Sequence, residues 1–190
     1  MERITVNSKE YLVGYHTQEF RIEGELDSPI LCDYRNAWLG SGYYFWTEVE
    51  FAKYWGEDFK IRNTGYYDVY SAEIDVENCL NVVFNEQHYF FFLRCLEKAI
   101  NYFQQKEERT TLKEVHEFLE YNFWGKLGIT GILYDDLPSN SKNKPNRKYS
   151  VIEYEEYGKT KFLYYKRRIQ VAVFSLSEIH NFNLFLGEQC

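Results

Sequence analysis

The stretch LGSGYYFWTEVEFAKYW, residues 39–55, predicts three elements of structure in succession. Two glycines flank a serine and are followed by aromatic residues, which indicates a tight turn entering a short strand over 40–46. Thr47, with Glu50 three residues later, is typical of a capping box at the start of a helix. Apolar residues then recur at helical spacing, at Val49, Ala52 and Trp55. We therefore expect a helix over 47–57.

Strands and helices are also expected on both sides of this segment. Alternating or short apolar runs predict strands, at 11–16, 66–76, 128–137 and three in succession within 149–175. Residues 17–39 are expected to be mostly loop, and 177–186 a turn followed by a last strand or short helix. Strands, two helices and strands again favour an α+β fold, in a single domain over residues 1–190.

The two helices between the strand groups are expected over 86–106 and 111–124. Apolar side chains at helical spacing are predicted to face the core in the first helix, at Phe90, Leu93, Leu96, Ile100 and Phe103. The second helix has its own set of inward-facing residues, Leu112, Val115, Phe118 and Leu119. Thr111 and Glu114 form its capping box.

Aromatic residues make up 19% of the chain, with Tyr 18, Phe 15 and Trp 4. Such side chains fill cores and also stack on flat ligands. The net charge of −7 argues against general binding of nucleic acid. Between Lys142 and Arg168, however, nine Lys or Arg residues and three Glu give a local charge of +6. This segment, with its basic loop at 139–148 and the pair Tyr164 and Tyr165, is consistent with a nucleic-acid contact, with a docking surface for an acidic partner, or with an ordinary solvated loop.

Several classes of protein are not expected. The chain has no apolar run of the roughly 18–20 residues that cross a bilayer, and no secretory signal pattern at its start. Four cysteines without a CxxC pair favour a reduced, cytoplasmic protein. No P-loop and no GxSxG motif occurs. His116-Glu117-x-x-Glu120 lacks the second histidine of a zinc helix, so no metal is expected.

Four segments, taken in order, resemble the ADP-ribosyltransferase superfamily. They are YHT (15–17), LGSGYYFWTEVEFAKYW (39–55), GITGILYDD (128–136) and IQVAVFSLSEI (169–179). The resemblance is to the branch of diphtheria toxin and the poly(ADP-ribose) polymerases, with its H-Y-[EDQ] signature. It implies a split β-core with a helical insertion, and NAD as the substrate that supplies ADP-ribose. The family includes toxins, phage-related effectors and defence enzymes.

The resemblance also implies roles for individual residues. His16 corresponds to the histidine that hydrogen-bonds the adenosine ribose of NAD. Thr17 stands where the family usually has a glycine whose backbone binds the nicotinamide carboxamide. Gly42 belongs to the turn whose backbone approaches the ligand. Tyr44 corresponds to the signature tyrosine against one face of the nicotinamide ring. Either Tyr54 or Trp55 corresponds to a second aromatic residue that closes the other face.

Gln170 falls at the third signature position, and it is the main departure from a carboxylate. An amide keeps a hydrogen bond to the nicotinamide ribose but lacks the charge that favours an oxocarbenium-like transition state. We therefore expect transfer of a single ADP-ribose to a protein or nucleic acid. Glu153, Glu155 and Glu156 could instead supply a nearby carboxylate, but ordinary charge on the surface of a strand is the favoured interpretation of all three.

Two alternatives stay open. One is a catalytically silent module of the same fold that binds NAD, nucleic acid or protein. The other is a ribonuclease-type toxin that cuts RNA with a histidine and basic residues. An antitoxin-like partner is conceivable for a toxin.

Overall fold

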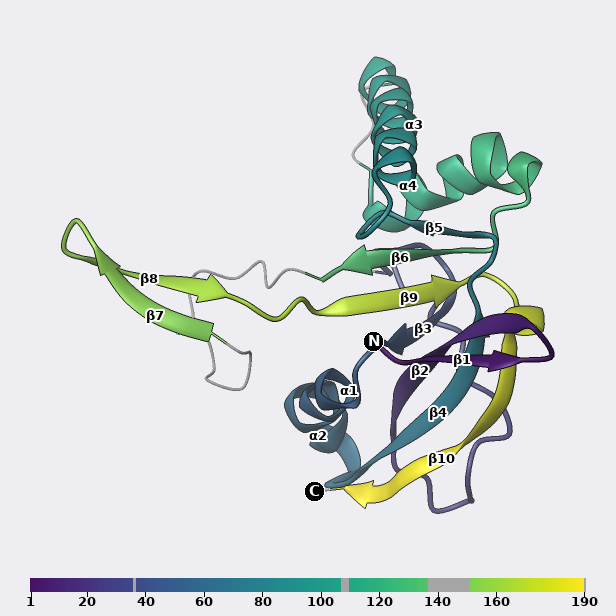
Figure 1. Ribbon diagram of the computed structural model, residues 1–190, viewed down its shortest axis with the longest axis vertical. Coiled ribbons are helices and arrows are strands. Elements are labelled where there is room, and N and C mark those ends of the chain that lie inside the picture. The colour runs from purple at the N-terminus through teal and green to yellow at the C-terminus, as the bar shows by residue number, and fades with distance from the viewer. Residues whose placement is uncertain (36, 107–109, 137–150, 190) are drawn as a thin grey trace.

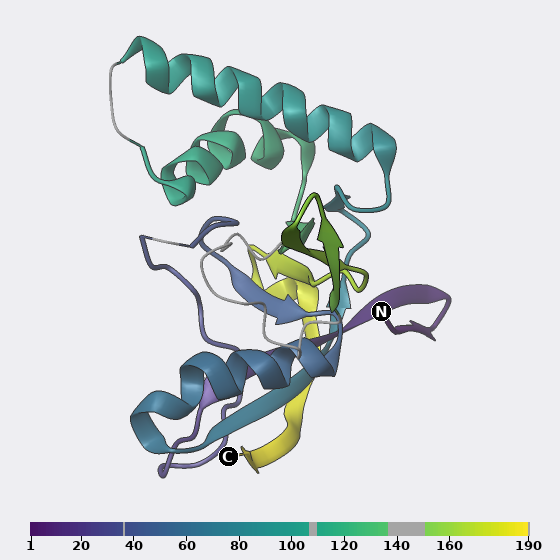
Figure 2. The ribbon, with the colours of Figure 1, turned by 90° about the vertical axis from the view of Figure 1, so that its left-hand side faces the viewer.

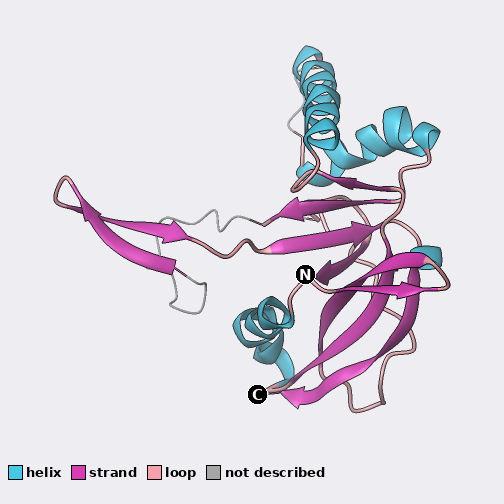
Figure 3. Ribbon diagram, in the orientation of Figure 1, coloured by secondary structure: helices cyan, strands magenta, loops and turns pink. Residues whose placement is uncertain are grey.

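The structure is a computed structural model that describes residues 1–35, 37–106, 110–136 and 151–189 (Figure 1). It is a mixed α+β fold, which confirms the predicted class. The structure has no regular alternation of single strands and helices (Figure 3). A pair of helices separates an earlier group of strands in the chain from a later one. The basic loop expected at 139–148 lies outside the described residues.

Within the described residues, the main sheet has eight strands. Along the sheet they are β10 (Ile179–Gln189), β4 (Tyr67–Asp75), β2 (Lys9–Glu19), β3 (Tyr43–Trp46), β9 (Ile169–Val173), β6 (Gly131–Asp135) and β5 (Cys79–Asn81), while β1 (Arg3–Val6) pairs with β2. The β5–β6 pair is parallel and the other pairs are antiparallel. A separate two-stranded sheet, β7 (Val151–Glu156) and β8 (Lys159–Tyr164), projects away from the main sheet (Figure 1).

The main sheet is divided between β2 and β3. These strands share one pair, Tyr15↔Trp46, whereas β2 and β4 share nine. The two halves pack against each other through a buried cluster that includes Leu12 of β2 and Phe45 of β3. Gly14 permits this approach, because a Cβ at that position would lie 2.8 Å from the Cβ of Phe45. The strands near β2 and β3 therefore meet over a short distance and then separate.

In each half of the sheet, one face packs against the other half, and helices cover the remaining face (Figure 2). Over β2 and β4 lie α1 (Val49–Trp55), the π-helix η1 (Gly56–Lys60) and α2 (Ile61–Thr64). Over β6 and β9 lie α3 (Glu86–Gln105), α4 (Leu112–Leu119), the π-helix η2 (Glu120–Trp124) and the short η3 (Gly125–Leu127). A final short helix, η5 (Leu176–Glu178), precedes β10. None of the described helices is long and apolar enough to cross a membrane.

The capping box predicted at Thr47 is wrong, whereas the one at Thr111 is confirmed. α1 begins at Val49 and its N-cap is Glu48, without a side-chain cap. Thr47 instead donates its backbone N–H and its hydroxyl to the carbonyl of Ile169, at 3.1 and 3.3 Å. The chain is still paired with β9 there, so the helix starts two residues later. At Thr111 both reciprocal bonds with Glu114 are present.

The predicted inward face of the helix at 86–106 is wrong in part. Phe90 and Ile100 are exposed, and the buried residues are instead Phe92, Cys95 and Ala99. Four apolar residues in a row, 90–93, satisfy more than one helical phase, so periodicity alone could not select the face. Leu112 of α4 is also exposed, contrary to expectation. The strand predicted at 11–16 extends at both ends, as β2.

Candidate functional site

His16 stands where β2 and β3 separate. Beyond the pair Tyr15↔Trp46, its Nδ1 lies 2.9 Å from the carbonyl oxygen of Tyr44. A carbonyl oxygen only accepts, so Nδ1 carries the proton and Nε2 has a free lone pair. Burial lowers the pKa of His16 to about 4, which keeps the ring neutral near pH 7. Nε2 is buried and has no hydrogen-bond partner among the described residues.

Tyr44 is fixed through its hydroxyl. The hydroxyl donates to the carbonyl of Gly40 at 2.7 Å and accepts from the N–H of Leu39 at 2.9 Å. Burial raises the pKa of this phenol. Its ring packs against the core cluster under α3 and α4. The ring of Tyr44 is therefore held against the core cluster, and its hydroxyl is bound to the turn that precedes β3.

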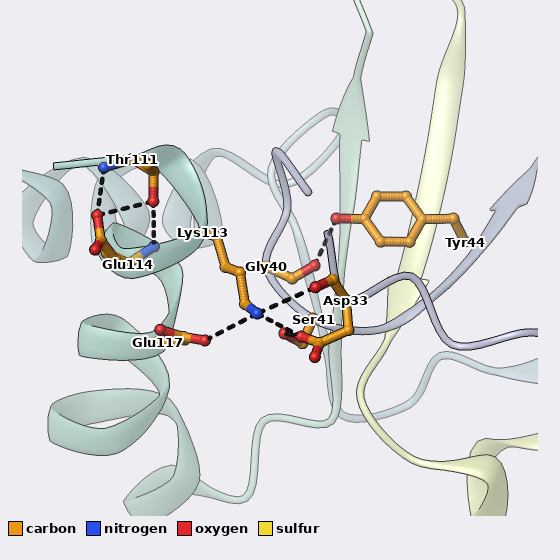
Figure 4. A network of polar contacts seen from close by, with 8 residues as sticks. All are labelled: Asp33, Gly40, Ser41, Tyr44, Thr111, Lys113, Glu114 and Glu117. Atoms are coloured by element: carbon orange, nitrogen blue, oxygen red, sulfur yellow. Dashed lines mark hydrogen bonds and ion pairs between the residues drawn. The ribbon is translucent and has the colours of Figure 1, made fainter. Parts of the chain in front are cut away.

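That turn is held to α4 by a network of polar contacts (Figure 4). Lys113 forms an ion pair with Asp33 at 2.5 Å and donates to the Asp33 carbonyl at 3.2 Å. Ser41 donates its hydroxyl to the same carboxylate at 2.5 Å. Glu117 lies 3.7 Å from the Lys113 ammonium, one helical turn along α4. Sequence reasoning missed this network, which links α4 through the turn to Tyr44.

Gly42 does not offer a free amide. Its N–H donates to the carbonyl of Cys32 at 3.1 Å, and its own carbonyl accepts from the Cys32 N–H at 2.9 Å. A Cβ at this position would lie 2.9 Å from the carbonyl oxygen of Val173 in β9. Close packing against β9 therefore explains the glycine at this position without a ligand.

Gln170 shares a sheet face with Tyr44. In the β3–β9 register Tyr44 pairs with Ala172 and Trp46 pairs with Gln170, so alternate residues place all four on one side. The Gln170 side chain is 7% exposed. Its Oε1 is buried and has no partner among the described residues. Gln170 is therefore a second buried acceptor near the division of the sheet.

Thr17 faces α1, on the side of β2 opposite to His16. Its hydroxyl donates to the carbonyl of Ala52 at 2.8 Å, and the residue is buried. The hydroxyl is thus used to hold α1 against β2. The Cβ that Thr17 carries, where the resemblance implies glycine, lies in this packed contact.

The two aromatic candidates of α1 point to different neighbours. Tyr54 donates its hydroxyl to Glu50 at 2.7 Å, and Glu50 also forms an ion pair with Lys166. Burial and the neighbouring carboxylate raise the pKa of Tyr54 to about 12. The Trp55 ring lies 4.2 Å from that of Phe59 and 6.2 Å from that of Trp46, measured between centroids. Trp55 is therefore the one that contacts the sheet face carrying Gln170.

A further side chain covers this face. The Arg168 guanidinium lies 5.1 Å from the ring centroid of Trp46 and 6.0 Å from that of Phe51. It also forms an ion pair with Asp136 at 2.9 Å. Side chains alternate along an extended segment, so residues 168 and 170 lie on one side. This alternation could have predicted from the sequence that Arg168 lies next to Gln170.

The structure places Tyr44 and Gln170 on one face of β3 and β9, with Trp55 close to the same face. The His16 ring lies on the other face, 5.6 Å from the ring centroid of Phe45, and only its Nδ1 reaches the backbone carbonyl of Tyr44. The structure does not bring β7, the strand of Glu153, Glu155 and Glu156, into the main sheet. Glu156 instead forms an ion pair with Lys161 of β8. Two pockets in the described part of the chain, of about 570 and 430 Å³, are lined by other residues.

Comparisons with protein-family models, with curated proteins and with solved structures found no match for this chain. Among the residues that the structure describes, no three His, Cys, Asp or Glu side chains gather in a way that could hold a metal ion.

Proposed function

We propose that this chain is a mono-ADP-ribosyltransferase, which moves ADP-ribose from NAD to a protein or nucleic acid and releases nicotinamide. One observation carries the proposal. His16 Nε2 and Gln170 Oε1 are buried acceptors with no partner among the described residues, and they belong to two of the three signature positions. Buried polar atoms in proteins are nearly always satisfied. Each acceptor, one on either face of β3, can bind a hydroxyl group of a ligand, as the two riboses of NAD offer.

The proposed roles follow from the direction of each hydrogen bond. His16 uses Nδ1–H to bind the Tyr44 carbonyl, so its Nε2 accepts from a hydroxyl of the adenosine ribose. Gln170 Oε1 accepts from a hydroxyl of the nicotinamide ribose and orients the bond that breaks. Tyr44, whose hydroxyl is held by the 39–40 turn, lies against the nicotinamide ring. Trp55 is the better candidate for the opposite wall.

The neutral amide sets the expected activity. As nicotinamide leaves, positive charge develops on the ribose, and a carboxylate at this position would stabilise it more strongly than an amide. Gln170 supplies a partial dipole without that charge. The proposal is therefore slow transfer of one ADP-ribose unit rather than polymer synthesis.

A catalytically silent binding module is the second candidate, because specific contacts favour it. Thr17 carries a Cβ and a committed hydroxyl at the position of the expected glycine, and Arg168 lies over Trp46 next to Gln170. The ribonuclease alternative has less support. Acid–base cleavage near neutral pH is best served by a histidine with a pKa near the operating pH, and burial lowers the pKa of His16 and of His116 to about 4.

The deciding experiment incubates the protein with NAD labelled in the adenylate, together with cell extract. Separate nuclease and protease treatments then identify the acceptor. Label transfer that is lost in His16→Ala supports the enzyme. Binding of NAD, seen as a rise in melting temperature, without transfer supports the silent module. Neither transfer nor binding overturns both, and cleavage of RNA without NAD supports the nuclease.

Gln170→Glu is the sharper variant. It restores the carboxylate with almost the same shape, so NAD hydrolysis should rise about tenfold or more. Gln104→Glu makes the same chemical change on the exposed end of α3 and is the matched control. An unchanged rate in Gln170→Glu contradicts the placement of Gln170 at the scissile ribose.

A further inference from the structure

A pocket of about 570 Å³ lies away from the residues of the proposed NAD site. It is lined by the hairpin of β1 and β2, by the segment that joins β4 to α3, and by Leu133 of β6. Its size suits a small ligand. Val76, Cys79 and Leu133 supply the apolar part of the lining, and the rest is polar.

The polar lining is oriented by bonds to the backbone. Asn81 Oδ1 accepts from the N–H of Phe84 at 2.9 Å, and Asn85 Oδ1 accepts from the N–H of His88 at 3.1 Å. His88 Nδ1 accepts from the N–H of Asn81 at 3.0 Å. Because backbone N–H groups only donate, these three contacts fix which atom of each side chain is the acceptor.

The remaining polar groups of these three side chains are donors. Within the described part of the chain, the amide NH₂ of Asn81, the amide NH₂ of Asn85 and the Nε2–H of His88 make no hydrogen bond. Ser8 adds a hydroxyl to the lining, and two cations, Arg3 and Lys9, stand at the same pocket. Because the acceptors of Asn81, Asn85 and His88 are already used, this part of the pocket favours a ligand rich in acceptors.

Two carboxylates also line the pocket, but they are exposed. Glu10 pairs with Arg3, and Glu77 lies 3.5 Å from Lys9, with side chains 51% and 69% exposed. Exposed ion pairs contribute little to stability, so both carboxylates can turn into solvent when a phosphate binds. Asp75, at 2.5 Å from Lys9, is mostly buried and stays with it.

We propose that this pocket binds a small phosphate monoester. A phosphate dianion carries only acceptors at neutral pH, and its oxygens can meet the amides of Asn81 and Asn85 and the His88 Nε2–H together. The organic group of the ester would lie against Val76 and Leu133. This site is independent of the proposed NAD site, because the two share no residue.

The test uses phenyl phosphate as the probe, titrated into the whole chain at pH 7.5 and constant ionic strength. Binding is followed by ¹H–¹⁵N chemical shifts, including the side-chain amide signals of Asn81 and Asn85. Saturable shifts at these residues, absent with phenol and much weaker with benzoate, are expected. Benzoate binding as tightly as phenyl phosphate, or no saturable shift up to 10 mM, overturns the proposal.

Asn81→Asp and Asn85→Asp make the test specific. Each keeps the oxygen that accepts from the backbone and replaces the donor NH₂ with a charged oxygen, so the fold is retained while an anion is repelled. Affinity for phenyl phosphate should fall at least tenfold in each. Asn101→Asp, the same change at an exposed position of α3, should stay within twofold. Wild-type affinity in Asn85→Asp would overturn the site, whatever happens to NAD transfer.

Discussion

The imidazole of His16 and the carbonyl of Tyr44 join β2 to β3 where their backbone pairing ends, with Nδ1 2.9 Å from the oxygen. A side chain thus takes the place of the next backbone bond. It satisfies the carbonyl while the strands separate, and it leaves Nε2 buried and free to accept. The contact at the end of the β2–β3 pairing therefore also leaves free the Nε2 acceptor on which the proposed NAD site depends.

Burial of histidine makes stability depend on pH. The pKa of His116 is lowered to about 4 in the folded protein, below the usual 6.5, so the unfolded chain takes up the proton first as the pH falls. The stability contribution is fully present above about pH 6.5 and is lost between there and pH 4. At pH 5 the loss from this one group is about 2 kcal/mol.

His116→Phe should remove that part of the pH dependence. Its Nδ1 has no partner among the described residues, so the variant should match the wild type at pH 7 or exceed it. Urea unfolding at pH 7 and pH 5 measures both differences. The variant should lose about 2 kcal/mol less than the wild type between the two pH values. An equal loss in the two proteins would contradict a buried, neutral His116.

Gly14 is predicted to be intolerant of a side chain. A Cβ there would lie 2.8 Å from Phe45 Cβ and 3.0 Å from Ile74 Cγ1, between the two halves of the sheet. Gly14→Ala should lower the free energy of unfolding by about 1–3 kcal/mol, as overpacking of a core does. Gly187→Ala is the matched control, because its new Cβ would lie 3.3 Å from a flexible Leu184 methyl and 3.9 Å from Asp68 Oδ1. Equal effects of the two substitutions on urea unfolding would argue against close approach of β2 and β3.

A structural feature could be predicted from the sequence when the residues that form it are close together in the chain. The capping box at Thr111 was predictable because Thr111 and Glu114 are both local and no strand competes for them. The one at Thr47 was not, because a partner 122 residues away, Ile169, holds the chain extended. The resemblance predicted one site for His16, Tyr44 and Gln170, but the strand register places only Tyr44 and Gln170 on one face, and the His16 ring lies beside Phe45 on the other. The roles of Lys113 and Arg168 depend on contacts between distant elements that no local pattern encodes.

Lys113 is predicted to order the turn that carries Gly40 and Ser41. Removing its ammonium frees the Asp33 carbonyl and leaves the Asp33 carboxylate with Ser41 alone, so the 33–42 segment loses its main link to α4. Lys113→Met should cost at most about 1 kcal/mol of global stability, since the pair is partly exposed. It should still speed hydrogen exchange at the amides of Gly40 and Gly42.

Lys126→Met, an exposed lysine in η3, is the control for the charge change. Exchange at the two glycine amides should remain as in the wild type in this variant. If Lys113→Met leaves their exchange unchanged as well, the turn is held by its own backbone bonds, such as that from the Gly40 N–H to the Ala37 carbonyl.

Trp55, rather than Tyr54, is predicted to contact NAD. The Tyr54 hydroxyl is bound to Glu50, which also binds Lys166, and the Tyr54 ring lies beside Phe51. The Trp55 ring instead approaches Trp46, the residue paired with Gln170. Stacking of an aromatic side chain on a base contributes about 1–3 kcal/mol, so Trp55→Leu should weaken NAD binding about tenfold. Tyr54→Leu should change the affinity less than twofold.

Melting temperatures of both variants without NAD show whether a substitution has weakened the fold rather than the contact with NAD. If the two variants are equally stable and Tyr54→Leu has the larger effect on NAD affinity, the assignment is reversed.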